Sequence, residues 1–373
     1  MPENLVFFDP KVNITCRQRN EKYNEGVNER FVDAAQLESD EEEVSLRPTK
    51  LDQFIGQDRV KRNLATFLEA AKKRDPKMLG KGEGILDHIL FYGPPGLGKT
   101  TLAVIVASEL GVSLKRTTGK SIERAGDVAA ILTSLSDGDV LFVDEIHRLN
   151  PQIEETFYSA MEDFRFDIVL GKGPSARTIT LPLNRFTLIG ATTRVSLLSS
   201  PLRDRFGIIE RLDYYTHADL AKVALRGAKA LGIEIGSDIS IEVAKRGRGT
   251  PRIVLRLLRR ARDFAQVQGL KTITKEVLEE TFKALEVNEF GLDKMDRRLM
   301  ETMITRFNGG PVGLDTMAAI LGEDRDTVED VIEPFLLQEG MLERTPRGRV
   351  ILDRGYQACG MKAPNREVEP YLF

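Results

Sequence analysis

The chain has 373 residues, 41% of them hydrophobic and 30% charged, which is usual for globular domains and at roughly 150 residues per domain predicts two or three. The net charge of −3 excludes a polycation, so any contact with nucleic acid has to come from a local basic patch. No apolar stretch reaches the roughly 20 residues that span a bilayer, and no basic segment followed by an apolar core opens the chain, so we expect a cytoplasmic protein. Cys16 and Cys359 lie far apart without metal-ligand spacing, which argues against a disulfide framework or a zinc site.

The first 45 residues are polar and include an acidic run at 38–43, so we expect a flexible tail with at most a short strand at 4–8. From 46 to 216, apolar strands alternate with amphipathic helices. This alternation predicts an α/β domain with a parallel sheet covered by helices on both faces. The candidate strands are Ile89–Tyr92, Val140–Val143 and Phe186–Ala191.

The segment Gly93–Thr100 fits the pattern G-x-x-x-x-G-K-[ST] and lies between a predicted strand and a predicted helix. Glycines let backbone N–H groups point into one concavity, and the following helix N-terminus adds positive potential for a phosphate. Lys99 would reach the β- and γ-phosphates of ATP, and Thr100 would ligate Mg²⁺. The alternative is an ordinary Gly/Pro turn, which the flanking strand and helix disfavour.

Two acids, Asp144 and Glu145, end the second candidate strand. Asp144 would hold Mg²⁺, and Glu145 would orient and polarise the attacking water. An acidic pair here could also be a solvated helix cap, but the phosphate loop upstream favours the catalytic interpretation. The third candidate strand ends in the hydroxyls of Thr192 and Thr193, which could contact the γ-phosphate or the attacking water. Alone this is weak evidence for such a role, because threonine is common at strand ends.

Arginines at two places further along the chain have open interpretations. The segment Ser200–Gly207 holds Arg203 and Arg205 near a turn, and an arginine there could pair with an acid or act as an arginine finger in a neighbouring subunit's site. Arg252, in the first turn of a predicted helix, could reach back to the γ-phosphate or be a surface charge.

Residues 217–287 show helical spacing with no convincing strand, which predicts a small all-helical domain. Residues 288–360 predict three helices, at Arg298–Phe307, Leu314–Leu321 and Asp326–Glu339, and then a hairpin with a basic tip. That order describes a winged helix, followed by a tail at 361–373. In the third helix we expect a capping box of Asp326 and Glu329 and a buried face of Val331, Ile332, Phe335 and Leu336.

The order of these motifs resembles AAA+ ATPases and, within them, the RuvB family of bacterial motors for Holliday-junction branch migration. The resemblance covers about residues 46 to 360. It is carried by the segments Asp144–Leu149, Gly190–Arg194, Ser200–Gly207, Arg248–Arg252, Gly309–Leu314 and Arg344–Arg349. The acidic N-terminal tail is longer than such a motor requires.

The resemblance implies an ATP-driven ring, expected to be a hexamer, that pumps duplex DNA in recombination and repair together with RuvA and the resolvase RuvC. Thr193 would be the sensor-1 residue, Arg205 a finger acting in trans, and Arg252 the sensor-2 residue acting in cis. Residues 162–181, with a hairpin at about 165–182 and a turn at 171–174, would include the RuvA docking hairpin. The implied nucleotide contacts are Leu46, Arg47, Gly96, Gly98, Lys99, Thr100, Thr101, Glu162, Asp163, Phe164, Tyr215 and Arg252. The implied DNA contacts are Arg325, Arg344, Arg347 and Arg349.

Three other functions remain to be weighed. A protein unfoldase would carry an aromatic gripping residue between the phosphate loop and the acidic strand, but residues 111–139 hold no Phe, Tyr or Trp and do hold Lys115, Arg116, Lys120 and Arg124. A clamp loader or replication initiator would also bind DNA, and only the family-specific motifs disfavour it. A non-enzymatic winged-helix regulator would need neither Glu145 nor Arg205.

Overall fold

The computed structural model describes residues 47–74, 86–170 and 177–364. All of them belong to one compact unit, Ser45–Phe373. The expected N-terminal tail with its strand at 4–8, the turn at 171–174 and the last nine residues lie outside these ranges. None of the helices in the described ranges is long and apolar enough to cross a membrane.

A five-stranded parallel sheet in the order β2-β3-β6-β1-β7 forms the centre of the first domain. Its strands are β1 (Ile89–Tyr92), β2 (Leu114–Thr118), β3 (Val140–Asp144), β6 (Thr187–Thr192) and β7 (Ile208–Arg211). The three strands expected from sequence are present, while both edge strands, β2 and β7, were missed. The α/β prediction for this domain is confirmed.

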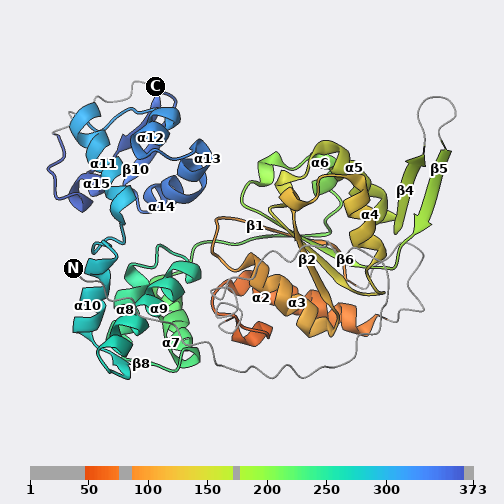
Figure 1. Cartoon of the computed structure of the whole chain (residues 1–373), viewed down its shortest axis with the longest axis horizontal. Coiled ribbons are helices and arrows are strands. Elements are labelled where there is room, and N and C mark those ends of the chain that lie inside the picture. The colour runs from red at the N-terminus through yellow and green to blue at the C-terminus, as the bar shows by residue number, and fades with distance from the viewer. Residues whose placement is uncertain (1–46, 75–85, 171–176, 365–373) are drawn as a thin grey trace, which may run out of the picture. The chain divides into compact units, whose positions relative to one another are not determined.

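Alternating side chains of each strand enter two different cores. In β1, Ile89 and Phe91 pack in the same cluster as α2 and α3, whereas Leu90 packs in the cluster of α4 and α5. Figure 1 shows the resulting layers, with α2 and α3 on one face of the sheet and α4, α5 and α6 on the other. The helices and helical turns of this domain are η1 (Leu51–Gln53), α2 (Asp58–Lys73), α3 (Lys99–Leu110), η2 (Gly119–Ser121), α4 (Ala125–Thr133), η3 (Ile146–Arg148), α5 (Pro151–Glu162), η5 (Val195–Leu197) and α6 (Ser200–Arg203).

An antiparallel hairpin of β4 (Arg165–Leu170) and β5 (Arg177–Pro182) leaves the domain after α5. It coincides with the hairpin that the family resemblance implied at about 165–182. In the central sheet the parallel register aligns Tyr92 with Thr192 and Val143 with Gly190. The carboxyl ends of β1, β3 and β6 therefore meet at one edge, where α/β proteins bind their ligands.

The second domain consists of α7 (His217–Ala230), α8 (Ser237–Lys245), α9 (Pro251–Val267) and α10 (Lys275–Ala284). The expectation of an all-helical domain needs one correction, because β8 (Glu234–Ile235) and β9 (Thr272–Ile273) pair in parallel. A two-residue strand is too short to produce an alternating pattern. Buried side chains of this domain, such as Leu258, continue the core formed around α2 and α3.

The third domain is a winged helix with a core of its own. Its elements are α11 (Lys294–Phe307), α12 (Leu314–Leu321), α13 (Arg325–Thr327), the π-helical turn η6 (Val328–Ile332), α14 (Glu333–Gln338), β10 (Leu342–Thr345), β11 (Gly348–Ile351) and α15 (Asp353–Ala358).

Two expectations for its third helix were wrong. The N-cap residue is Asp324 rather than Asp326, and it makes no side-chain cap bond. Val331 is 57% exposed, whereas Ile332, Phe335 and Leu336 are buried as expected. A π-helical turn holds one extra residue, which rotates the following side chains relative to a regular helix and turns Val331 outward.

Candidate nucleotide site and winged-helix surface

The phosphate loop runs from the end of β1 to the start of α3. Gly93 has a φ of +137°, and a Cβ there would lie 2.4 Å from the Leu212 carbonyl oxygen, so only glycine fits. Lys99 opens α3, and its ammonium donates hydrogen bonds to the carbonyls of Gly93 at 2.7 Å and Pro94 at 2.8 Å. Burial lowers the pKa of Lys99 to about 8, although the carboxylate of Asp144 opposes that shift. The loop thus holds the buried side chain of Lys99 at a place where its positive charge would strongly attract an anionic ligand.

The end of β3 brings Asp144 to the same place. Its Oδ2 lies 3.5 Å from Thr100 Oγ1, and its Oδ1 accepts a hydrogen bond from the Glu145 N–H at 2.9 Å. Two hard oxygen ligands on one side of the phosphate loop suit Mg²⁺, which takes one or two protein ligands and completes its shell with phosphates and water. In the described ranges no cluster of three or more His, Cys, Asp or Glu could hold a metal by itself. The residues present therefore fit an ion shared with a nucleotide.

Glu145 has the left-handed backbone conformation, with a φ of +46°, which is uncommon for non-glycine residues and is enriched at functional sites. The half-exposed carboxylate forms an ion pair with Arg148 Nε at 2.7 Å. To polarise a water molecule, the Glu145 carboxylate would have to leave Arg148 or bind Arg148 and the water at the same time.

The end of β6 supplies hydroxyls, as the sequence indicated. Thr192 is buried, and its Oγ1 lies 2.8 Å from His147 Nδ1 and accepts a hydrogen bond from the Arg194 N–H at 3.0 Å. Thr193 directly follows the strand and is partly exposed. Of the two threonines, Thr192 makes contacts within the protein, whereas Thr193 is the more exposed.

The second domain closes over the phosphate loop. The Arg252 N–H donates to the Gly96 carbonyl at 3.4 Å, and a Cβ on Gly96 would lie 3.2 Å from Arg252 Cβ. Tyr215, between the two domains, is buried, and its hydroxyl donates to the Leu97 carbonyl at 3.1 Å. Four of the residues expected at the nucleotide line one pocket: Arg47, Gly98, Thr101 and Tyr215. Leu46 lies outside the described residues.

Arg205 lies against the end of α5 in its own chain. Its guanidinium pairs with Glu162 Oε2 at 3.0 Å, donates to the Pro201 carbonyl at 2.7 Å and stacks over the Tyr158 ring at 4.3 Å. Among the described contacts none joins Arg205 to the phosphate loop. The pair with Glu162 agrees with the structural interpretation of Arg205. The interpretation as an arginine finger in a neighbouring subunit stays a prediction.

The expected nucleotide contacts Glu162, Asp163 and Phe164 are likewise not brought to the phosphate loop of their own chain. Glu162 binds Arg205, and Asp163 pairs with Arg165 at 3.0 Å. Phe164 is buried and packs edge-on against Phe186. Of the three, only Glu162 and Asp163 have exposed side chains.

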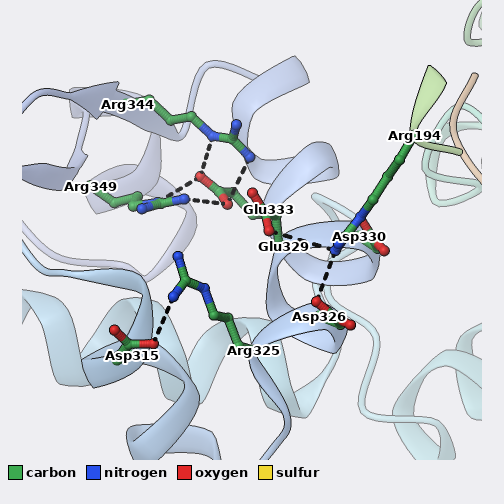
Figure 2. A network of polar contacts seen from close by, with 9 residues as sticks. All are labelled: Arg194, Asp315, Arg325, Asp326, Glu329, Asp330, Glu333, Arg344 and Arg349. Atoms are coloured by element: carbon green, nitrogen blue, oxygen red, sulfur yellow. Dashed lines mark hydrogen bonds and ion pairs between the residues drawn. The ribbon is translucent and has the colours of Figure 1, made fainter. Parts of the chain in front are cut away.

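The structure separates the wing arginines that the sequence grouped together. Arg344 and Arg349 each form a two-pronged pair with Glu333, whose side chain is fully buried (Figure 2). Burial works against the charge of Glu333, but the hydrogen bonds from Arg349 and Arg344 outweigh it and lower the pKa of that carboxyl. Arg347 is exposed at the turn between β10 and β11, and no polar partner for it is found in the part of the chain that the structure describes. Arg325 pairs with Asp315 at 3.4 Å, with both side chains exposed.

Comparison with known proteins accounts for all three domains. The model of the RuvB P-loop domain of the Holliday junction DNA helicase matches residues 46–212, that of the RuvB AAA lid matches 215–288, and that of the RuvB C-terminal winged helix matches 289–360. The chain belongs to the RuvB family.

Solved structures of Thermotoga maritima RuvB agree with this assignment. One, described as the Holliday junction branch migration motor, is 47% identical, with a TM-score of 0.76, and the match covers 86% of this chain and 100% of that one. A lysine-to-arginine variant of the same protein is 48% identical, with a TM-score of 0.77, over 86% of this chain and 99% of that one. The RuvB assignment makes the first domain an AAA+ ATPase and confirms the lid and the winged helix expected from sequence.

Sequence reasoning within the RuvB framework missed the residues that hold others in place. His147 and Arg148 belong to a motif that was noticed, but their bonds to Thr192 and Glu145 were not expected. Arg194 belongs to the segment Gly190–Arg194, but its contacts with the winged helix were not expected, and Glu333 was not singled out at all. The side-chain partners of Glu333 and Arg194 lie 11 or more positions away in sequence, beyond any local spacing signal.

Proposed function

We propose that this chain is the motor of Holliday-junction branch migration in recombination and repair, that it forms a ring expected to be a hexamer, and that each ATP lies between two subunits. ATP hydrolysis and branch migration are properties of the RuvB family to which the chain belongs. The proposal rests on one observation: a single chain contains both a nucleotide site and a DNA-binding type of domain. The lid covers the phosphate loop near Arg252, and the winged helix presents an exposed basic turn.

The residues divide the hydrolysis step among them. Lys99 binds the β- and γ-phosphates, and Glu145 orients the attacking water and accepts its proton. Thr193 contacts the γ-phosphate or the water. Arg252, in the lid of the same subunit, is the sensor-2 residue and reaches the γ-phosphate. Arg205 of the neighbouring subunit stabilises the charge that develops on the transferred phosphoryl group. Thr100 and Asp144 would hold Mg²⁺, which would neutralise phosphate charge.

Domain boundaries and partners complete the proposal. We place the ATPase domain at 46–216, the lid at 217–287 and the winged helix at 288–360, with tails at 1–45 and 361–373.

The winged helix contacts the DNA backbone through Arg347 and the half-exposed Arg344, without reading sequence. RuvA docks on the β4–β5 hairpin, whose Ile179 is an exposed large apolar side chain, and RuvC joins the assembly. A cytoplasmic location stays a prediction.

A four-way-junction dissociation assay tests this function. Wild-type protein should separate the junction arms with ATP, faster when RuvA is present. The variant Glu145→Gln keeps nearly the same shape, so it should bind ATP and DNA but leave the junction intact. Duplex unwinding or protein unfolding without junction movement by the wild type would rule the proposal out.

A further inference from the structure

Arg194 connects the ATPase domain to the winged helix. It lies two residues beyond the end of β6, and its guanidinium reaches three acids of the third helix of the winged helix (Figure 2). Nε binds Asp330 Oδ1 at 2.7 Å, and Nη2 lies 3.2 Å from Asp326 Oδ1 and 3.6 Å from Glu329 Oε2. One arginine thus serves as the shared partner of three carboxylates from another domain.

The three acids form a face suited to a cation and not to DNA. Asp326, Glu329 and Asp330 stand at positions i, i+3 and i+4, which share one side of a helix. The third helix of such domains is the one that helix-turn-helix proteins place in the DNA groove. Here its acidic side would be repelled by phosphates, and Arg325 beside it pairs with Asp315. This face therefore serves contact with the protein, and Arg194 occupies it.

A chain of polar contacts runs from Arg194 to the catalytic loop. The Arg194 N–H binds Thr192 Oγ1, which is also bonded to His147 Nδ1, and His147 lies in the short turn that follows Glu145. Burial lowers the pKa of His147, and the charges of Glu145 and Asp330 both oppose that shift. His147 is thus within electrostatic reach of the Glu145 carboxylate on one side and of Asp330 of the winged helix on the other.

A second arginine holds the winged helix in a different way. Arg248, in the loop that leads to Arg252, binds the buried carboxylate of Asp296 on α11, also pairs with Asp293, and stacks over the Phe335 ring. That pair is buried, whereas the partners of Arg194 are 25% to 67% exposed. The Arg194 pairs are partly exposed, so they cost less to break and re-form in each cycle than a buried pair, whose separation leaves an uncompensated charge.

We propose that Arg194 couples the γ-phosphate end of the ATP site to the winged helix: it holds the acidic face of Asp326, Glu329 and Asp330 on the ATPase domain in one nucleotide state and releases it in another. The lid carries the winged helix throughout by the buried Arg248 pair. Arg194 is a positioning residue in this scheme and touches no substrate. The inference rests on the proposed function, because that function places ATP beside Glu145, where the series of contacts from Arg194 ends.

Hydrogen exchange tests the coupling without any activity measurement. Exchange of the amides of residues 325–332 is followed in full-length protein with no nucleotide, with ADP and with a non-hydrolysable ATP analogue. In the wild type, exchange of this segment should differ between nucleotide states. In Arg194→Ala it should be fast and equal in all of them. The matched control is Arg211→Ala, which breaks an equally charged pair with Asp213, at 3.1 Å, inside one domain and should behave like the wild type.

A double-mutant cycle with junction assays gives the second readout. Arg194→Ala and Asp330→Ala should each lower the base pairs migrated per ATP by roughly two- to fivefold, and the double variant should be no worse than either single one. ATP affinity should stay within about twofold, because neither residue contacts the nucleotide, and Arg194→Lys should restore part of the loss.

Two hydrogen-exchange results would overturn the coupling: exchange of 325–332 that does not depend on nucleotide in the wild type, or exchange in Arg194→Ala that matches the wild type in every state. Fully additive losses in the cycle would overturn it as well. Failure of the proposed function has a different signature, because a wild type that moves no junctions can still show the nucleotide-dependent exchange.

Discussion

Lys99 is under two opposing electrostatic demands, and its protonation links ATP binding to pH. Burial lowers its pKa to about 8, so at pH 8 about half of the Lys99 side chains of the free protein are neutral amines. A triphosphate beside Nζ favours the charged form and raises the pKa again. Binding therefore takes up a proton above pH 8, and ATP affinity should fall by up to about tenfold per pH unit there.

Isothermal titration calorimetry at pH 8.5 to 9, in buffers of different ionisation enthalpy, measures this proton uptake. In Lys99→Arg the guanidinium stays charged, so the uptake should vanish even if affinity drops. Equal uptake by both proteins would show that another group titrates.

Single residues were predicted from sequence where a motif fixes the local backbone, and missed where only distant partners give them a role. Lys99, Thr100 and Asp144 meet because two strand ends share an edge, which the pattern implies. Glu333 follows three other acids on the same helix and looks like them, yet it alone is buried between two arginines. No spacing rule distinguishes a buried carboxylate from exposed ones when the fold decides which side turns inward.

The wing contains arginines with two different duties, and a pair of variants separates them. Arg347→Ala should weaken duplex binding and lower the salt slope by about one phosphate contact, with unchanged stability, because its side chain is exposed. Arg349→Ala should lower the free energy of unfolding by about 2 kcal/mol, because Glu333 then stays buried with one partner. Fluorescence anisotropy across a salt series and thermal melts measure both. Equal DNA losses with equal melting temperatures would contradict this division.

The elements missed from sequence are those whose surroundings blur their pattern. β2 reads Leu-Lys-Arg-Thr-Thr and lies at the edge of the sheet, half-exposed, so it lacks the apolar run of a central strand. β7 is the other edge, and its Ile209 is 44% exposed. The π-helical turn Val328–Ile332 shifts the helical period by one residue, which is why a regular helical pattern placed Val331 in the core.

The lid and the winged helix are joined through the buried pair of Arg248 and Asp296, whose removal should be costly. Arg248→Ala leaves Asp296 buried without its cation, which we expect to lower the free energy of unfolding by about 3 kcal/mol. Burial raises the pKa of Asp296 to about 6, above its unfolded value of 3.8. The folded state thus binds the extra proton between these values, so its stability falls as pH rises through 6.

Loss of Arg248 removes the charge that opposes this shift, so the penalty of Arg248→Ala should be larger at pH 8 than at pH 5. Urea unfolding at both pH values measures it. Arg260→Ala is the control, because its pair with Asp263 is exposed and should contribute under about 0.5 kcal/mol. A penalty that does not change with pH would mean that Asp296 is not the group left uncompensated.

A ring with shared sites makes a prediction that no single subunit could satisfy. Glu145→Gln removes the group that polarises water, and Arg205→Ala removes the finger, so each variant alone should be nearly inactive as an ATPase. In a mixed ring, a site with an intact Glu145 can receive Arg205 from a neighbour that carries the Glu145→Gln change. Random mixing of equal amounts gives such interfaces roughly one time in four, so about a quarter of wild-type ATPase activity should return. If Arg205 acted only on its own chain through Glu162, the mixture would stay as inactive as its components.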